Sequence, residues 1–200
     1  MNLRILLCPS LFIIFLVPAC KQKCTILRNH PLSAFMYVTP NVPEIKLGDT
    51  LRVKIFIPYE SVRLDNNEVI NVINSSISTS GFWLMTYMGL VNGLPEIAEN
   101  NFKIIPIKGS FARFNHVTVR VTYVRDVDGF VFETYLIPTI KGLAFFSNWK
   151  AEGWMNRRCE LNIFNPIIGS QNNNHQLLRD FYGPGANDPI PENHYYVWVK

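Results

Sequence analysis

The chain has 200 residues, which is enough for one domain with a substantial core. Apolar residues make up 48% of it and charged residues 17%, so it can bury enough surface to offset its conformational entropy. This balance excludes a disordered or collagen-like protein. The formal charge of +4 is small and dispersed, whereas a dedicated nucleic-acid-binding protein carries a clustered basic stripe. Composition therefore predicts a globular domain with no nucleic-acid partner.

Residues 1–19 have the pattern of a signal peptide. Arg4 is followed by an apolar run that ends at Pro18 and Ala19. This run is shorter than the roughly 20 apolar residues that a transmembrane helix needs, and lysines follow it at once. The pattern predicts export and cleavage after Ala19, which leaves Cys20 as the new N-terminus.

The residues around the cleavage point also form a motif, which consists of Leu16, Val17, Ala19 and Cys20. This motif resembles the lipobox of bacterial lipoprotein precursors, although Pro18 departs from the usual pattern. Plain secretion and an uncleaved membrane anchor are the alternatives. The resemblance implies lipidation at Cys20 and attachment to a membrane through acyl chains, each buried methylene contributing about 0.8 kcal/mol. Lys21 stands where inner-membrane lipoproteins carry Asp, which by analogy favours an outer-membrane lipoprotein of the cell envelope.

Two of the four cysteines remain for the folded part, because Cys8 leaves with the signal peptide and Cys20 would carry lipid. An exported protein occupies a compartment where disulfides persist, so Cys24 and Cys159 are a possible disulfide. The alternative is that Cys24 is an exposed thiol and Cys159 a small buried apolar residue.

Residues 20–32 are predicted to be the lipidated N-terminus and a tether, and residues 33–200 a single domain. Strand-like runs dominate this domain. In residues 51–57 the apolar side chains alternate with Arg52 and Lys54, as expected for a half-buried strand. Further predicted strands are residues 34–38, 83–88, 103–107, 117–123, 130–136, 143–147, 161–164 and 195–199.

Asp128-Gly129 lies between two of these runs and predicts a β-hairpin, because glycine supplies the positive φ that such turns use. Helix is indicated only at residues 68–73 and 175–182. Many short strands with almost no helix predict an all-β fold, an antiparallel β-sandwich that is Ig-like in the broad sense. In general layout the chain resembles small lipoproteins of the Bacteroidota type.

No pattern of catalytic or metal-binding residues stands out. The four histidines are scattered and lack the spacing of a zinc site, so no metal and no cofactor are expected. Asp126 and Asp128 lack the glutamate that would close a calcium loop, which favours a simple turn. The common hydrolase motifs are missing, so no catalytic residue is proposed.

The 13% aromatic content is the one unusual feature of the composition. Trp149 and Trp154 lie in a stretch rich in Asn, Gly and charge, which favours a loop over a strand. Exposed rings there are candidates for stacking on a carbohydrate or protein ligand, and the alternative is that they cover the open end of the sandwich.

The sequence thus predicts a lipid-anchored envelope protein with a non-catalytic binding or structural domain. The alternative function is an envelope hydrolase acting on carbohydrate or peptidoglycan-like material.

Overall fold

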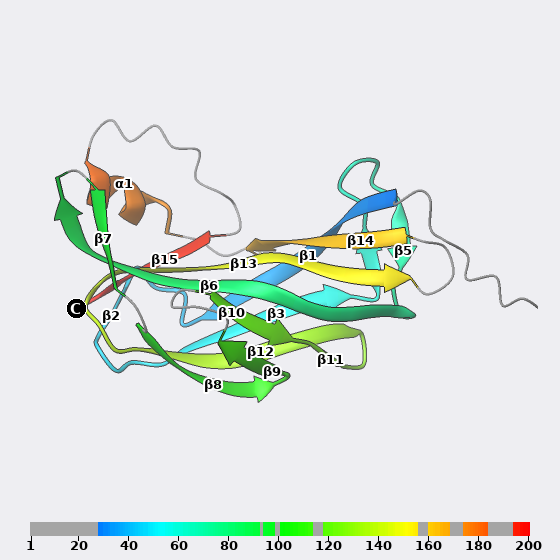
Figure 1. The fold of residues 1–200 in the computed structure, drawn as a ribbon, viewed down its shortest axis with the longest axis horizontal. Coiled ribbons are helices and arrows are strands. Elements are labelled where there is room, and N and C mark those ends of the chain that lie inside the picture. Colours follow the sequence, from blue (N-terminus) through cyan, green and yellow to red (C-terminus); the bar gives the residue numbers. More distant parts are fainter. Residues whose placement is uncertain are drawn as a thin grey trace, which may run out of the picture.

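The structure is a computed structural model that describes residues 28–92, 94–98, 101–113, 118–155, 160–168, 174–183 and 194–200. Its strands are β1 (Arg28–Thr39), β2 (Glu44–Ile45), β3 (Leu51–Pro58), β4 (Glu60–Val62), β5 (Val69–Asn71), β6 (Ser75–Val91), β7 (Leu94–Ala98), β8 (Phe102–Lys108), β9 (Ser110–Arg113), β10 (Thr118–Thr122), β11 (Val124–Arg125), β12 (Gly129–Pro138), β13 (Gly142–Met155), β14 (Glu160–Ile168) and β15 (His194–Val199). Among these residues one helix is present, α1 (Gln176–Tyr182). Figure 1 shows the arrangement.

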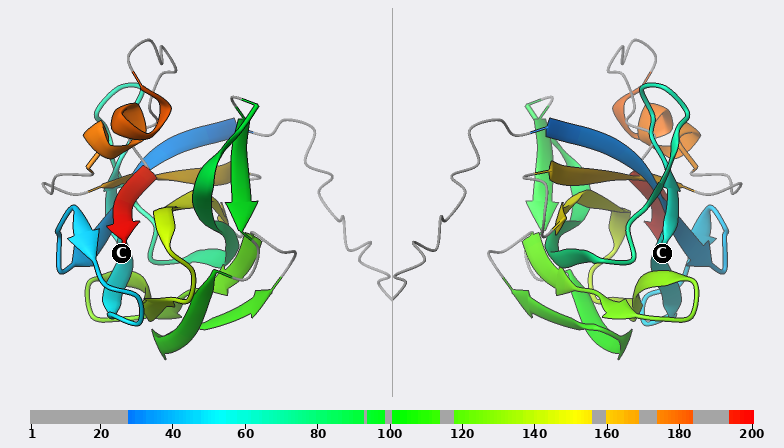
Figure 2. Two further views of the ribbon diagram at one scale, coloured as in Figure 1. Left: turned by 90° about the vertical axis from the view of Figure 1, so that its left-hand side faces the viewer. Right: turned by 90° about the vertical axis from the view of Figure 1, so that its right-hand side faces the viewer.

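Two layers of strands face each other across the core (Figures 1 and 2). One layer has the order β8-β12-β3-β1, and in the other β13, β6, β10 and β9 are successive neighbours, with β15 paired to β13. β14 joins the layers, because it pairs in parallel with β1 and antiparallel with β13. The predicted antiparallel β-sandwich is therefore confirmed, with parallel pairing at β1–β14 and β15–β2.

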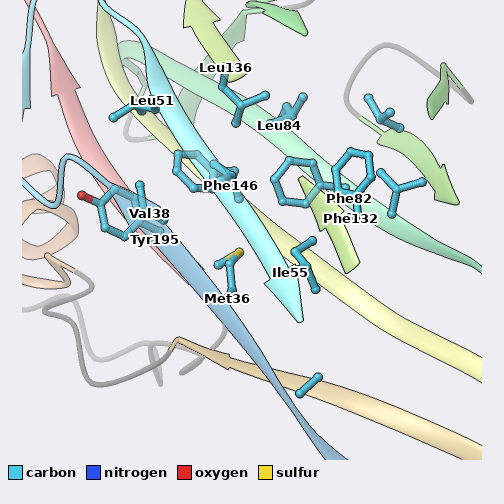
Figure 3. Packing of buried hydrophobic residues seen from close by; sticks show 14 of the residues in the cluster. Met36, Val38, Leu51, Ile55, Phe82, Leu84, Phe132, Leu136, Phe146 and Tyr195 are labelled. Atoms are coloured by element: carbon cyan, nitrogen blue, oxygen red, sulfur yellow. The ribbon is translucent and has the colours of Figure 1, made fainter. Parts of the chain in front are cut away.

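The core lies between the layers because apolar residues occupy the inward positions of both. The four apolar residues at alternate positions of β3, from Leu51 to Ile57, are fully buried, whereas Arg52 is exposed. The ring of Phe132 from β12 meets that of Phe82 from β6 with centroids 6.5 Å apart (Figure 3). Each such buried side chain contributes roughly 1.5–3 kcal/mol, so this contact between layers holds the sandwich together.

The predicted hairpin at Asp128-Gly129 is present but short. Only Val124 and Arg125 of β11 pair with β12, and the preceding strand β10 pairs instead with β6 and β9 in the opposite layer. Gly129 does not adopt the positive φ that the sequence suggested. A Cβ there would lie 2.3 Å from the carbonyl oxygen of Ile57, so glycine is needed for close approach of the strands.

Two local predictions differ from the structure. The helix expected at residues 68–73 is wrong, because Val69–Asn71 forms β5 and pairs with β4; its β-branched side chains favour a strand. Among the described residues, β1 already includes Arg28, five residues before the expected start of the domain at Ser33, because β14 provides a parallel partner that no local pattern reveals.

Helix α1 confirms the helix predicted at residues 175–182. It packs on the layer that contains β13 and β15, on the side that points away from the main core. Its Leu177, Leu178 and Phe181 contact a small cluster on the sheet that includes Phe145 and Tyr196. Within the described residues, no helix has the length and apolar character required to span a bilayer.

Candidate functional site

Only some of the residues singled out from the sequence lie among the residues that the structure describes. Cys20, Cys24 and Cys159 lie outside the described residues, so lipidation and the disulfide stay predictions. Trp149 and Trp154 lie in strand β13, opposite Gly81 and Ser76 of β6, and not in a loop as predicted. Pairing with long neighbouring strands extends β13 through this polar stretch. The placement of the two indole side chains lies outside what the structure describes.

A different surface gathers aromatic and charged side chains, namely the outward side of β1, β3 and β12, which we call the outer face. It consists of Phe35, Tyr37, Arg52, Lys54, Phe56, Val131, Glu133 and Tyr135. The strand register places Tyr37 beside Lys54 and Lys54 beside Glu133, while Phe56 lies between Phe35 and Val131. Because side chains alternate along a strand, these residues share one side while the core residues occupy the other.

The outer face is partly shielded from solvent even though it points away from the core. Val131 and Glu133 are only 1% and 3% exposed, and Tyr37, Lys54 and Phe56 are half-buried. The rings of Phe35 and Tyr37 lie 6.3 Å apart at 28°, and the ammonium of Lys54 lies 5.5 Å from the centroid of the Phe56 ring. The long side chains therefore pack against one another over the sheet, which leaves apolar surface between them.

A hollow of about 480 Å³ opens on this face. Its floor is formed by Tyr37, Lys54, Phe56 and Val131, and its rim by the turn that contains Asp126, Val127 and Asp128. Its volume falls within the roughly 300–1,000 Å³ that is typical of sites for small ligands. The hollow thus combines a largely apolar floor, which also carries the Lys54 ammonium, with a rim that carries two carboxylates.

The turn that forms the rim is held in place by Tyr59. The Tyr59 hydroxyl donates a hydrogen bond to the carbonyl of Asp126 at 2.8 Å, and the Tyr59 amide donates to the carbonyl of Asp128 at 2.9 Å. The Tyr59 ring also meets Phe130 edge to face, with centroids 5.4 Å apart. These contacts keep the rim in one conformation, which reduces the entropy lost when a ligand binds.

The charges at the hollow are largely compensated. Lys108 forms an ion pair with Asp126, and the hydrogen bond that its ammonium donates lowers the pKa of the Asp126 carboxyl, assisted by the amide of Val127 at 3.0 Å. Asp126 is therefore ionised and paired at neutral pH. The remaining charges that line the hollow are one cation, Lys54, and one anion, Asp128.

Next to the hollow, the carboxylate of Glu133 is buried in the sheet and forms an ion pair with Arg52. Its side chain is 4% exposed, whereas that of Arg52 is 56% exposed. The hydrogen bond from Arg52 to Glu133 raises the pKa of the guanidinium. In the strand register, Lys54 and Lys108 lie opposite Glu133 on the two neighbouring strands.

A second polar cluster lies where α1 meets the sheet. His175 and His194 both pack against Tyr196, with ring centroids 5.9 and 6.2 Å from it, and His194 Nδ1 is 3.2 Å from the Tyr196 hydroxyl oxygen. Burial, together with the charge of His175, lowers the pKa of His194 to about 4. The two histidines are distant in sequence, so no spacing rule could pair them. The described residues hold no group of three or more His, Cys, Asp or Glu that could bind a metal ion.

The residues of the hollow were missed in the sequence, although one signal was present. Phe56 stands at an outward position of the predicted strand 51–57, where the other outward residues are charged. Tyr37 is likewise an aromatic residue at an outward position of the predicted strand 34–38. Aromatic residues that gather on the solvent side of a sheet mark a binding surface, but a single one is common, so this signal was weak until the strand pairing was known.

Comparisons with known proteins place the chain in no family. No family model and no curated protein matches it. Among solved structures, the reeler domain of human F-spondin has a TM-score of 0.40 and 11% identity, covering 91% of this chain and 99% of that domain. A cohesin module from a family 33 glycoside hydrolase of Clostridium perfringens has a TM-score of 0.37 and 11% identity, covering 68% and 98%. A non-cellulosomal cohesin from Archaeoglobus fulgidus has a TM-score of 0.31 and 9% identity, covering 69% and 94%. Similarity at this level carries no inference about function.

Proposed function

We propose that this chain is an exported, lipid-anchored envelope protein whose β-sandwich binds a ligand at the hollow of the outer face without catalysing a reaction. The observation that carries the proposal is the hollow itself, with its floor of Tyr37 and Phe56 and its rim fixed by Tyr59. Apolar floors with a few well-placed polar groups are the usual form of ligand sites.

The chemistry of the hollow favours binding over catalysis. A hydrolase needs a general acid, which is a carboxyl group whose pKa is raised towards the working pH. The pKa of the Asp126 carboxyl at the rim is lowered instead, because Lys108 donates a hydrogen bond to it. A lowered pKa keeps Asp126 ionised and paired with Lys108 at neutral pH, so it does not act as a general acid.

The anchoring part of the proposal rests on the lipobox-like residues that end at Cys20. It is tested by expressing the full chain in bacteria with radiolabelled palmitate. We expect label on the wild type and none on Cys20→Ser. Label on both variants, or on neither, would contradict lipidation at this residue.

The binding part is tested by co-sedimentation of the unlipidated full chain, carrying Cys20→Ser, with purified bacterial envelopes. We expect Tyr37→Ala to abolish co-sedimentation, because it removes an aromatic ring from the floor of the hollow. The matched control is Leu94→Ala, which removes a side chain that is 71% exposed on β7, outside the outer face. Equal binding of Tyr37→Ala and wild type would show that the hollow is not the site.

A further inference from the structure

We infer that the ligand of the hollow is a neutral saccharide, held by stacking on the aromatic floor and by hydrogen bonds to the charged rim. This inference rests on the proposed binding function and adds the chemical class of the ligand. Three features of the hollow support it: the pattern of its apolar surface, its balance of charge, and the sheet geometry beneath it.

The floor offers flat apolar surface beside polar atoms. Tyr37, Phe56 and Val131 supply the apolar part, and the Tyr37 phenol carries a hydroxyl at its edge. A sugar ring has the same division, because its axial C–H groups form an apolar face while its hydroxyls point outwards. Aromatic rings with a polar edge complement such a surface. Phe35, which stacks beside Tyr37, extends the aromatic surface past the hollow.

The charges at the hollow disfavour an ionic ligand of either sign. Asp126 is already paired with Lys108, which leaves Lys54 and Asp128 as one cation and one anion. An anionic ligand that pairs with Lys54 would meet the Asp128 carboxylate, and a cationic ligand would meet Lys54. Hydroxyl groups are both donors and acceptors, so a neutral saccharide can accept from the Lys54 ammonium and donate to Asp128 at once.

The strands under the hollow do not present an edge to a peptide. β3 is paired on both sides, with β1 and β12, and β1 is also paired with β14 as far as Met36. β12 is paired with β3 on one side and with β8 and β11 on the other. A peptide therefore cannot add a strand to β3 or β12 here, although strand addition is a common way in which sheets bind extended peptides. The outer face offers side chains alone, which suits a ligand recognised through its rings and hydroxyls.

The test is affinity electrophoresis of the full chain carrying Cys20→Ser through gels that contain one polysaccharide each. The neutral probes are a β-glucan, a xylan, an α-mannan and a galactan, and the charged probes are polygalacturonate and chitosan. We expect retardation by at least one neutral probe and by neither charged probe. For that neutral probe the dissociation constant should change less than about twofold between about 0.05 and 0.5 M NaCl, because no net charge is neutralised.

Variants connect this binding to the hollow. We expect Tyr37→Ala to weaken binding at least about tenfold, whereas Tyr37→Phe keeps the ring and loses about threefold or less. Asp128→Asn keeps the shape of the rim but removes a charged acceptor, and should weaken binding about three- to tenfold. The control Leu94→Ala should bind as the wild type does. Circular dichroism of each variant shows whether it is folded.

The outcomes separate this inference from the proposed function. If Tyr37→Ala abolishes binding to envelopes but no neutral polysaccharide retards the wild type, the saccharide is refuted while the hollow remains a binding site. Retardation by a charged probe alone, reversed by salt, refutes neutrality of the ligand. If a neutral probe retards Tyr37→Ala and the wild type equally, both the saccharide inference and the hollow as its site are refuted.

Discussion

Replacement of Asn174 by alanine is expected to destabilise the domain by about 3 kcal/mol, because this residue joins three parts of the fold. Its side-chain amide donates hydrogen bonds of 3.0 Å to the carbonyls of Val42 and Tyr196, and its side chain is buried immediately before α1. Its φ of 57° is in the left-handed region, where asparagine is tolerated better than alanine.

The magnitude follows from these contacts. The two hydrogen bonds, one buried and one partly buried, contribute about 1 kcal/mol each, and placing alanine in the left-handed region costs about 1 kcal/mol more. Asn174→Gly loses the same two hydrogen bonds but adopts this φ without strain, so we expect about 2 kcal/mol for it. The glycine variant therefore separates the loss of hydrogen bonds from the backbone strain.

The assay is urea unfolding followed by tryptophan fluorescence, with the free energy of unfolding taken from linear extrapolation. The expected order of stability is wild type, then Asn174→Gly, then Asn174→Ala. If the free energies of unfolding of both Asn174→Gly and Asn174→Ala lie within about 0.5 kcal/mol of the wild-type value, the role of the amide is refuted. A glycine variant less stable than the alanine variant would refute the argument from φ.

Three further predictions concern other parts of the molecule. His194 has a pKa of about 4 in the folded state, below its ordinary value of 6.5, so its contribution to stability is present above pH 6.5 and is lost as the pH falls towards 4. Discounted for partial exposure, this loss is about 1–2 kcal/mol, and His194→Gln should flatten the pH dependence of the urea midpoint. Tyr59→Phe removes the hydrogen bond to Asp126 and should lower the free energy of unfolding by about 1 kcal/mol in urea. It should also weaken ligand binding at the hollow, although Tyr59 does not line it. Unchanged binding would show that the rim does not depend on this hydrogen bond. Gly129→Ala should destabilise by more than about 2 kcal/mol in the same assay because the new Cβ meets backbone, whereas the control Gly89→Ala meets nothing within 4 Å and should change stability little.

The prediction of the fold from sequence succeeded where neighbouring residues carry the pattern. Leu51 to Ile57 alternates so regularly that its strand and its buried side follow directly, and the structure confirms both. The strands at residues 34–38 and 195–199 are confirmed as parts of β1 and β15, because short runs rich in aromatic and apolar residues favour strands. Period-two alternation is a local property, because successive side chains of any strand point to opposite sides.

Partners of strands were much harder to infer. The run at residues 117–123 was expected to pair with the run that follows it, yet its strand β10 lies in the other layer and pairs with β6 and β9. Val119 and Val121 become buried from that side of the core. The expected loop placement of Trp149 and Trp154 was wrong in a similar way, since this polar stretch became part of β13 through pairing with distant strands. Their role in ligand stacking stays a prediction.

The sequence by itself determined that the chain is globular and β-rich, and it supplied the only signs of export and lipidation, in residues 1–20. Tertiary structure alone decided which strands are neighbours, and hence that Tyr37, Phe56 and Asp128 surround one hollow. The physical reason is that alternation sets the side to which a residue points, whereas a site needs residues from several strands to be adjacent. That adjacency depends on the packing of the whole core, which no single segment encodes.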